Sequence, residues 1–176
     1  KTIDKEGFEN EMKKQRNLAK KNQKFVMDSK DIKWKLSSDS PHSNFIGYSE
    51  EDSSSKIVNW AEVDDKVYIA LDNTPFYAES GGQIGDTGII ENKDFSAEVV
   101  DTQKNGDFII HICNLTTGDI STDINVSCKI DSMRRKDIKI NHSATHLLHQ
   151  ALKDILGDHI NQAGSLVHPD YLRLDI

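Results

Sequence analysis

The chain has 176 residues, of which 36% are hydrophobic and 29% are charged, and its formal net charge is -7 at pH 7. This length suits one or two small domains with a folded core. No apolar run reaches the roughly 18 residues of a membrane-spanning helix, the polar residues 1–5 do not resemble a signal peptide, and the acidic balance argues against a generally basic nucleic-acid binder.

The N-terminal segment carries the local positive charge. The first 36 residues contain 11 Lys/Arg against 6 Asp/Glu, while the rest of the chain contains 11 against 23. Residues 4–31 place Phe8, Met12 and Val26 at a loosely helical spacing, with no proline and, after the first turn, no glycine. The pattern predicts one long helix with a narrow apolar face. Its charge fits both a solvated surface and RNA binding.

Residues 37–55 have the composition of a linker or loop, with serine-rich and acidic stretches at both ends. The pattern then changes to short β-branched or alternating runs at residues 57–63, 67–71, 87–90, 97–101, 108–113 and 124–130. About six short strands separated by turns predict a small antiparallel barrel or sandwich. Among the turns, Asn105-Gly106 favours a tight hairpin.

A strongly periodic helix is predicted for residues 132–156. Apolar residues recur at i, i+3, i+4, i+7 and i+8 from Ala144, and Gly157 supplies the C-terminal stop. At about 100° per residue, this apolar stripe lies opposite His142. We therefore expect the stripe to pack on the hydrophobic core and the histidines to point away from that core. Residues 163–167 and 172–176 are then predicted to form two strands joined by a turn.

His142 and His146 lie one turn apart on this helix, which is how a helix offers two imidazoles to one metal ion. His149 falls on the same face. The spacing alone leaves open a zinc site and a merely polar, histidine-rich face, because it supplies no further ligands. A metalloprotease of the H-E-x-x-H type is a poor match, because Ser143 stands where the catalytic glutamate would be.

Cys113 and Cys128 form no Cys-x-x-Cys pair, so we expect neither a disulfide framework nor a cysteine zinc site, and a reducing, cytoplasmic setting. A second basic cluster, formed by Arg134, Arg135 and Lys136, lies at the start of the histidine helix. Such a cluster fits either a solvated face or contacts with phosphate.

Three segments together resemble the alanyl-tRNA synthetase family, in the part that follows its aminoacylation domain. They are residues 74–88 (TPFYAESGGQIGDTG), residues 141–149 (NHSATHLLH) and residues 162–167 (QAGSLV), in the order that the family shows. Residues 7–16 also look like the helix that leads into the family's editing region. The resemblance thus covers essentially the whole chain.

The resemblance implies a zinc-containing editing module that removes wrongly attached serine or glycine from alanine tRNA. An apolar pocket rejects an added hydroxyl poorly, which makes serine a natural error for a site sized near alanine. By similarity, His142 and His146 are two zinc ligands. The implied catalytic or pocket residues are Thr145, Gln162 and Gln83, with Ser80 nearby, and the candidates for tRNA phosphate contacts are Arg134, Arg135 and Arg173.

The glycine-rich segment has two readings. Gly81, Gly82 and Gly85 are compatible with tight turns alone, and by resemblance they also line the editing pocket. The family completes its zinc site with a Cys-x-x-x-His motif further downstream, and none occurs before Ile176. We therefore expect half of a zinc site, weak or absent zinc binding, and little deacylation by these residues alone. Use of ATP and magnesium would belong to the missing aminoacylation domain.

Together these patterns predict an α+β fold in three parts. These are a connecting helix and linker (residues 1–40), a small antiparallel β-barrel with the glycine-rich loop (residues 41–131), and the truncated start of an α/β editing domain (residues 132–176). The expected partners are alanine tRNA and the rest of a synthetase chain, without DNA or a membrane. Two other functions stay open: a non-catalytic tRNA-binding or packing module, and a free-standing trans-editing deacylase.

Overall fold

The computed structural model describes residues 7–9, 11–12, 14, 32–35, 40, 42–120 and 125–176. The chain divides into two compact units, Lys1–Asp31 and Ile32–Ile176. In the first unit the described residues are helical, and Lys14 Nζ forms an ion pair with Glu11 Oε1 at 2.6 Å. Most of the long helix predicted for residues 4–31 lies outside the described residues.

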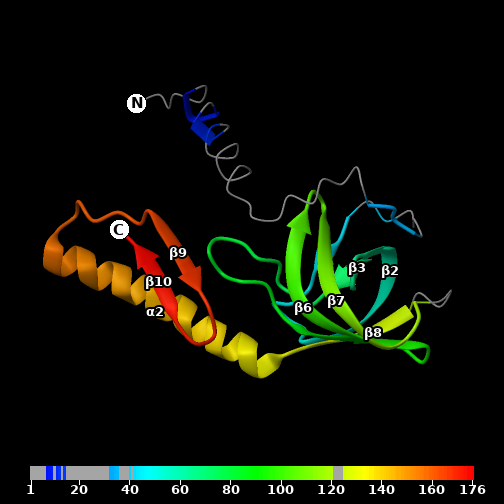
Figure 1. Ribbon diagram of the computed structural model, residues 1–176. Helices are drawn as coiled ribbons and strands as arrows, with labels where there is room; N and C mark the ends of the chain where they lie inside the picture. The colour runs from blue at the N-terminus through cyan, green and yellow to red at the C-terminus, as the bar shows by residue number, and fades with distance from the viewer. Residues whose placement is uncertain are drawn as a thin grey trace. The chain divides into compact units, whose positions relative to one another are not determined.

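The second unit is built on a closed antiparallel barrel with the strand order β2-β3-β7-β6-β5-β8 (Figure 1). β2 closes the barrel because its first half pairs with β8 and its second half pairs with β3. The predicted small barrel is therefore confirmed. Its strands are β2 (Asp52–Val63), β3 (Lys66–Leu71), β5 (Gly88–Glu91), β6 (Phe95–Asn105), β7 (Phe108–Gly118) and β8 (Asn125–Ile130).

The barrel core follows from the alternation of side chains along its strands. In β8, Val126, Cys128 and Ile130 are buried while the residues between them are exposed, which is the two-residue period of a strand with one apolar face. Phe76, which is fully buried, joins this core from the loop after β4 (Asn73–Thr74). β4 itself pairs in parallel with the short β1 (Asn44–Phe45).

The predicted hairpin between β6 and β7 is confirmed, but its loop lies one residue later than the predicted Asn105-Gly106 turn. Asn105 pairs with Phe108, which leaves Gly106 and Asp107 as a two-residue loop. Gly106 adopts φ 60°, a left-handed conformation that glycine takes without steric cost.

The predicted fold class, α+β with a long N-terminal helix, is wrong for the described residues. Of these residues 46% lie in strands and 22% are helical, so the fold is mostly β. Strands extend beyond their predicted limits because pairing in the barrel outweighs local composition. Asp52–Ser55, for example, was expected in a polar linker but forms the start of β2, in register with Val126–Lys129 of β8.

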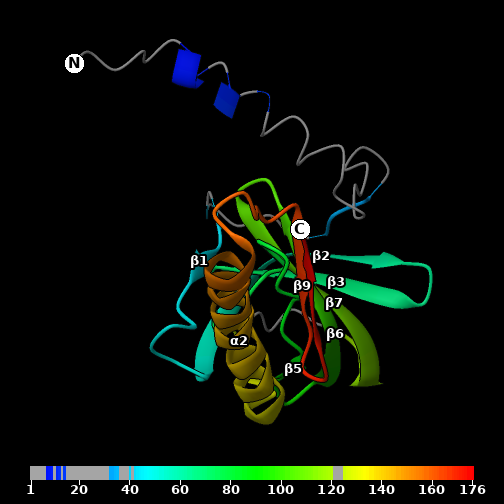
Figure 2. The ribbon, with the colours of Figure 1, turned by 90° about the vertical axis from the view of Figure 1, so that its left-hand side faces the viewer.

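One long helix, α2 (Ser132–Leu156), leaves the barrel and packs along a hairpin of β9 (Gly164–Val167) and β10 (Leu172–Asp175) (Figure 2). Asp131 begins the helix as its N-cap, accepting a hydrogen bond from the backbone N–H of Arg134. Gly157 ends it by donating its N–H to the Lys153 carbonyl. The predicted bounds of this helix are confirmed, and the division into three domains stays a prediction.

The predicted orientation of α2 is wrong. Its buried residues are Arg135, Ile138 and Thr145, which share a face with His142, whereas Leu147 is 73% exposed and Ile155 is 80% exposed. The helix thus turns its polar face toward the loop and hairpin of its own unit and leaves its apolar stripe at the surface. No helix among the described residues is long and apolar enough to cross a bilayer.

Candidate functional site

The glycine-rich loop is organised around a tight turn. Ser80 and Gln83 exchange two backbone hydrogen bonds, at 3.1 and 3.0 Å between N and O, and the residues between them, Gly81 and Gly82, have φ values of 59° and 84°. Positive φ at both central positions is the signature of a type I′ turn, which favours glycine. The turn reading of these two glycines is therefore confirmed.

Gly82 also allows a close approach to β9. A Cβ atom at this position would lie 2.5 Å from the carbonyl oxygen of Ser165. Val167 donates its N–H to the Gly82 carbonyl at 2.7 Å, and Ile84 donates to the Val167 carbonyl at 3.3 Å. These bonds join Gln83 and Val167 in a parallel bridge, so the loop reaches from the barrel to the hairpin, as Figure 1 shows.

A buried ion pair fixes the base of the loop to the start of α2. Asp86 is 2% exposed; its Oδ2 accepts hydrogen bonds from the Tyr77 N–H at 2.7 Å and from Arg135 Nε at 3.0 Å. The Arg135 guanidinium also bonds to Asp86 through Nη2 and to the carbonyl oxygens of Gly47 and Pro75. Because Arg135 is 4% exposed and bonded to three groups inside the protein, the structure argues against its predicted contact with tRNA phosphate.

The two predicted zinc ligands lie together on the face of α2 that meets this loop. The ring centroids of His142 and His146 are 5.1 Å apart, with planes inclined by 41°. His142 Nδ1 lies 2.7 Å from the side-chain oxygen of Gln83. A metal-binding histidine commonly uses its second ring nitrogen for such a bond, so the pair fits two positions of a zinc site.

The described residues do not complete that site. Within them, no group of three or more His, Cys, Asp or Glu side chains is placed to hold a metal ion. Cys113 and Cys128 are buried in the barrel core, and burial raises the pKa of the Cys128 thiol to about 11. Burial also raises the pKa of Cys113, so neither side chain is a ready thiolate ligand.

The remaining predicted pocket residues differ in their surroundings. Thr145 is 5% exposed, and its hydroxyl donates to the Asn141 carbonyl one turn earlier at 2.8 Å. Gln162 is exposed and donates from Nε2 to Ser165 Oγ at 3.1 Å, beside the point where β9 meets Gly82. The amide of Gln162 is therefore accessible, while the hydroxyl hydrogen of Thr145 is bound to the helix backbone.

Two predicted tRNA contacts remain. Arg134 is partly buried and donates from Nη1 to the Gly85 carbonyl at 2.8 Å, so it also ties α2 to the loop. Arg173, on β10, is 62% exposed, and its Nε lies 3.2 Å from Asp175 Oδ1. Of the three predicted arginines, Arg173 is the one most open to an external phosphate.

Sequence reasoning gave no role to two residues that organise the site, Asp86 and Asn141. Asn141 Nδ2 donates to the carbonyl oxygens of His168 and Pro169, each at 2.8 Å, and so holds the β9–β10 turn against α2. Both residues lie inside the segments that resemble the synthetase family, and this position was the only sequence feature that could have indicated a role for them. His149 Nε2 is buried without a hydrogen-bond partner among the described residues.

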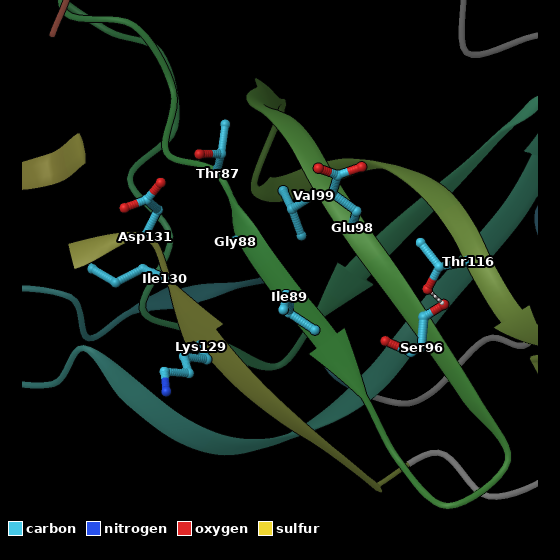
Figure 3. Close-up of a pocket in the computed structure, with 10 residues that line it drawn as sticks. All are labelled: Thr87, Gly88, Ile89, Ser96, Glu98, Val99, Thr116, Lys129, Ile130 and Asp131. Atoms are coloured by element: carbon cyan, nitrogen blue, oxygen red, sulfur yellow. Dashed lines mark hydrogen bonds between the residues drawn. The ribbon is translucent and has the colours of Figure 1, made fainter. Parts of the chain in front are cut away.

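A cavity in the described part of the molecule lies away from this site. It has a volume of about 590 Å³ and opens on the outside of β5, where Glu98 and Lys129 flank Ile89 (Figure 3). None of the predicted site residues lines it. This cavity is therefore not part of the candidate site, which is defined by the meeting of three segments.

Comparison with known proteins finds relatives in the family that these segments resemble. Residues 1–134 match the family described as tRNA synthetases class II (A). The chain is 46% identical over 192 residues to an alanine–tRNA ligase of Thermoanaerobacter sp. (strain X514), covering 99% of this chain and 21% of that protein. It is 41% identical over 186 residues to an alanine–tRNA ligase of Acetivibrio thermocellus, covering 98% of this chain and 21% of that protein.

A third relative is an alanine–tRNA ligase of Legionella pneumophila (strain Lens), which is 38% identical over 182 residues, covering 98% of this chain and 21% of that protein. The chain spans about one fifth of the length of these curated relatives. Its similarity to them runs through the barrel, the glycine-rich loop and the histidine helix. The chain therefore belongs to the family of class II tRNA synthetases, among the alanyl-tRNA synthetases.

Proposed function

We propose that this chain is one part of a longer alanine–tRNA ligase and that it contributes to the module that hydrolyses alanine tRNA mischarged with serine or glycine. The observation that carries the proposal is a contact between segments 59 residues apart, in which Gln83 Oε1 lies 2.7 Å from His142 Nδ1. The backbone of Gln83 also pairs with Val167. Polar groups that come together from three distant segments of the chain are typical of a functional site.

The chemistry asked of the site is hydrolysis of an aminoacyl ester. A zinc ion held by His142, His146 and ligands from the rest of the ligase would polarise or orient the reacting groups. Gln162 keeps its side-chain oxygen available to accept a hydrogen bond from the substrate amine or hydroxyl, because its amide N–H is directed to Ser165. Thr145 Oγ1 donates to its own helix, so toward a serine hydroxyl it would act as an acceptor.

The proposal treats these residues as an incomplete module. Two observations support this: the described residues supply two adjacent histidines without further ligands, and α2 exposes Leu147 and Ile155 on its apolar stripe. Ligands and packing from the remaining four fifths of a ligase would complete both. We therefore expect the isolated chain to lack deacylase activity.

Deacylation by the full-length ligase that contains this segment tests the proposal. Serine-charged alanine tRNA is incubated with the wild-type enzyme and with His142→Ala, and release of serine is followed over time. We expect the variant to lose activity by about 100-fold or more, a typical cost of removing a group that stabilises the transition state. A matched control is His159→Ala, which removes an exposed histidine beyond α2. Equal deacylation by His142→Ala and the control would contradict the proposal.

A second candidate function, tRNA binding without catalysis, is favoured by the cationic side chains that remain exposed. Among them are Lys136 and Lys139 on α2 and Arg173 on β10. In this case tRNA affinity would fall steeply with salt. Substituting Arg173 would then weaken binding, while the full-length ligase would show no release of serine.

A further inference from the structure

The loop that carries Gln83 is held rigidly where it meets His142. The backbone N–H and carbonyl of Gln83 are both bonded to Ser80, and the neighbouring groups of Gly82 and Ile84 are bonded to Val167. The side chain therefore projects from a backbone fixed on two sides. A side chain on such a fixed backbone is already ordered, so it can hold one geometry toward its partner.

A second link holds the same loop to the same helix. Asp86 lies three residues after Gln83, and Arg135 lies two helical turns before His142. The buried Asp86–Arg135 pair therefore fixes the loop and α2 in register, so the approach of Gln83 to His142 does not depend on one flexible side chain. The two links together connect the glycine-rich segment to the histidine motif.

An amide and an imidazole nitrogen can form this hydrogen bond in two ways. Either the Gln83 oxygen accepts Nδ1–H of His142, or the Gln83 amide donates to a bare Nδ1, which leaves the proton on Nε2. In the structure the oxygen is the atom that lies 2.7 Å from Nδ1. The first arrangement leaves Nε2 without a proton and free to bind a metal, whereas the second blocks both nitrogens.

We propose that Gln83 is a positioning residue that fixes His142 as the Nδ1–H tautomer and so presents Nε2 as a ligand. The statement about zinc rests on the proposed function, whereas the statement about the tautomer does not. This changes the role predicted for Gln83 from the sequence. Its side chain acts on the ligand histidine and not directly on the substrate.

The test is ¹⁵N NMR of the imidazole rings in the metal-free chain. Spectra of all variants are recorded at the same mildly basic pH. We expect His142 to carry its proton on Nδ1 in the wild type and in Gln83→Glu, whose carboxylate also accepts. In Gln83→Leu we expect a mixture of tautomers. The matched control Gln150→Leu, an exposed position on α2, should behave as the wild type.

A proton on Nε2 of His142 in the wild type would overturn the proposal, and so would an unchanged tautomer in Gln83→Leu. A second readout is the zinc affinity of the full-length ligase, which we expect to fall about 10- to 100-fold in Gln83→Leu and to be retained in Gln83→Glu. A wild-type ligase without zinc would overturn the proposed metal site, and the tautomer spectra would still decide the role of Gln83.

Discussion

The barrel and helix α2 use their side chains in opposite ways. In the barrel, one face of each strand supplies a shared apolar core, in which Phe76, Ile57 and Ile69 are fully buried. In α2, Arg135 is buried while Leu147 and Ile155 are exposed. The barrel encloses its own core, whereas the helix is attached through polar contacts and leaves apolar surface uncovered. This contrast is expected if the barrel is complete and the helix belongs to an unfinished module.

The largest expected effect concerns the barrel core. Phe76→Ala should reduce the free energy of unfolding by about 3 to 5 kcal/mol, because it removes a fully buried ring and leaves a cavity. Denaturant unfolding of the chain measures the loss. Leu147→Ala on α2 is the matched control and should cost less than about 0.5 kcal/mol. Similar losses at the two positions would remove the contrast between barrel and helix.

Breaking the buried Asp86–Arg135 ion pair should destabilise the fold nearly as much as Phe76→Ala. Arg135→Met leaves the Asp86 carboxylate buried without a counter-charge, and we expect a loss of about 3 kcal/mol in the free energy of unfolding. Adding Asp86→Asn removes the unpaired charge and keeps an oxygen for the Tyr77 N–H, so the double variant should recover part of the loss. A double variant less stable than Arg135→Met alone would argue against this account of the pair.

The barrel should also be acid-sensitive through His111. This fully buried histidine donates from Nδ1 to the Ile69 carbonyl and accepts from the Thr74 hydroxyl at Nε2, each at 2.8 Å. Burial lowers its pKa to about 4. Between about pH 6.5 and pH 4 the unfolded chain therefore binds a proton that the folded chain excludes. Stability should fall as the pH drops through this window, by about 3 kcal/mol in total.

Unfolding free energies measured from pH 7.5 to pH 4 test this prediction. His111→Gln removes the titrating group, so its stability should vary less with pH than that of the wild type. His159→Ala, which changes an exposed histidine, should keep the wild-type pH dependence. Identical pH profiles for the wild type and His111→Gln would contradict the prediction.

The smallest effect is expected on the apolar stripe of α2. In the isolated chain, Leu147→Ser combined with Ile155→Ser should change the free energy of unfolding by less than about 1 kcal/mol, because both side chains are exposed. In a full-length ligase that covers the stripe, the same pair should lower the melting temperature measurably. An equally small effect in both proteins would indicate that the stripe remains exposed.

The sequence predicted local elements better than their orientation. The alternation in β8 and the stop at Gly157 are local signals, and both elements formed where expected. The face of α2 could not be predicted in this way, because it depends on partners outside the helix. Arg135 illustrates this: its neighbours suggested a phosphate contact, but its counter-ion, Asp86, lies 49 residues earlier in the chain.

The sequence named segments that meet in the structure, but it did not predict the contacts between them. The resembling segments contain Gln83, His142 and Val167, which the structure brings together. The bond from Thr145 to its own helix and the support from Asn141 follow from three-dimensional packing that no spacing rule reveals. Asp52–Ser55 show the same limit in the barrel, since pairing with β8 makes a strand of a polar segment.

The central claim is that His142 and His146 are zinc ligands in a site completed by the rest of a ligase. Elemental analysis of the purified full-length ligase, its His142→Ala and His146→Ala variants and the His159→Ala control tests it most directly. We expect zinc in the wild type and in the control, and its loss in both ligand variants. Wild-type zinc content in both folded ligand variants, His142→Ala and His146→Ala, would contradict the account.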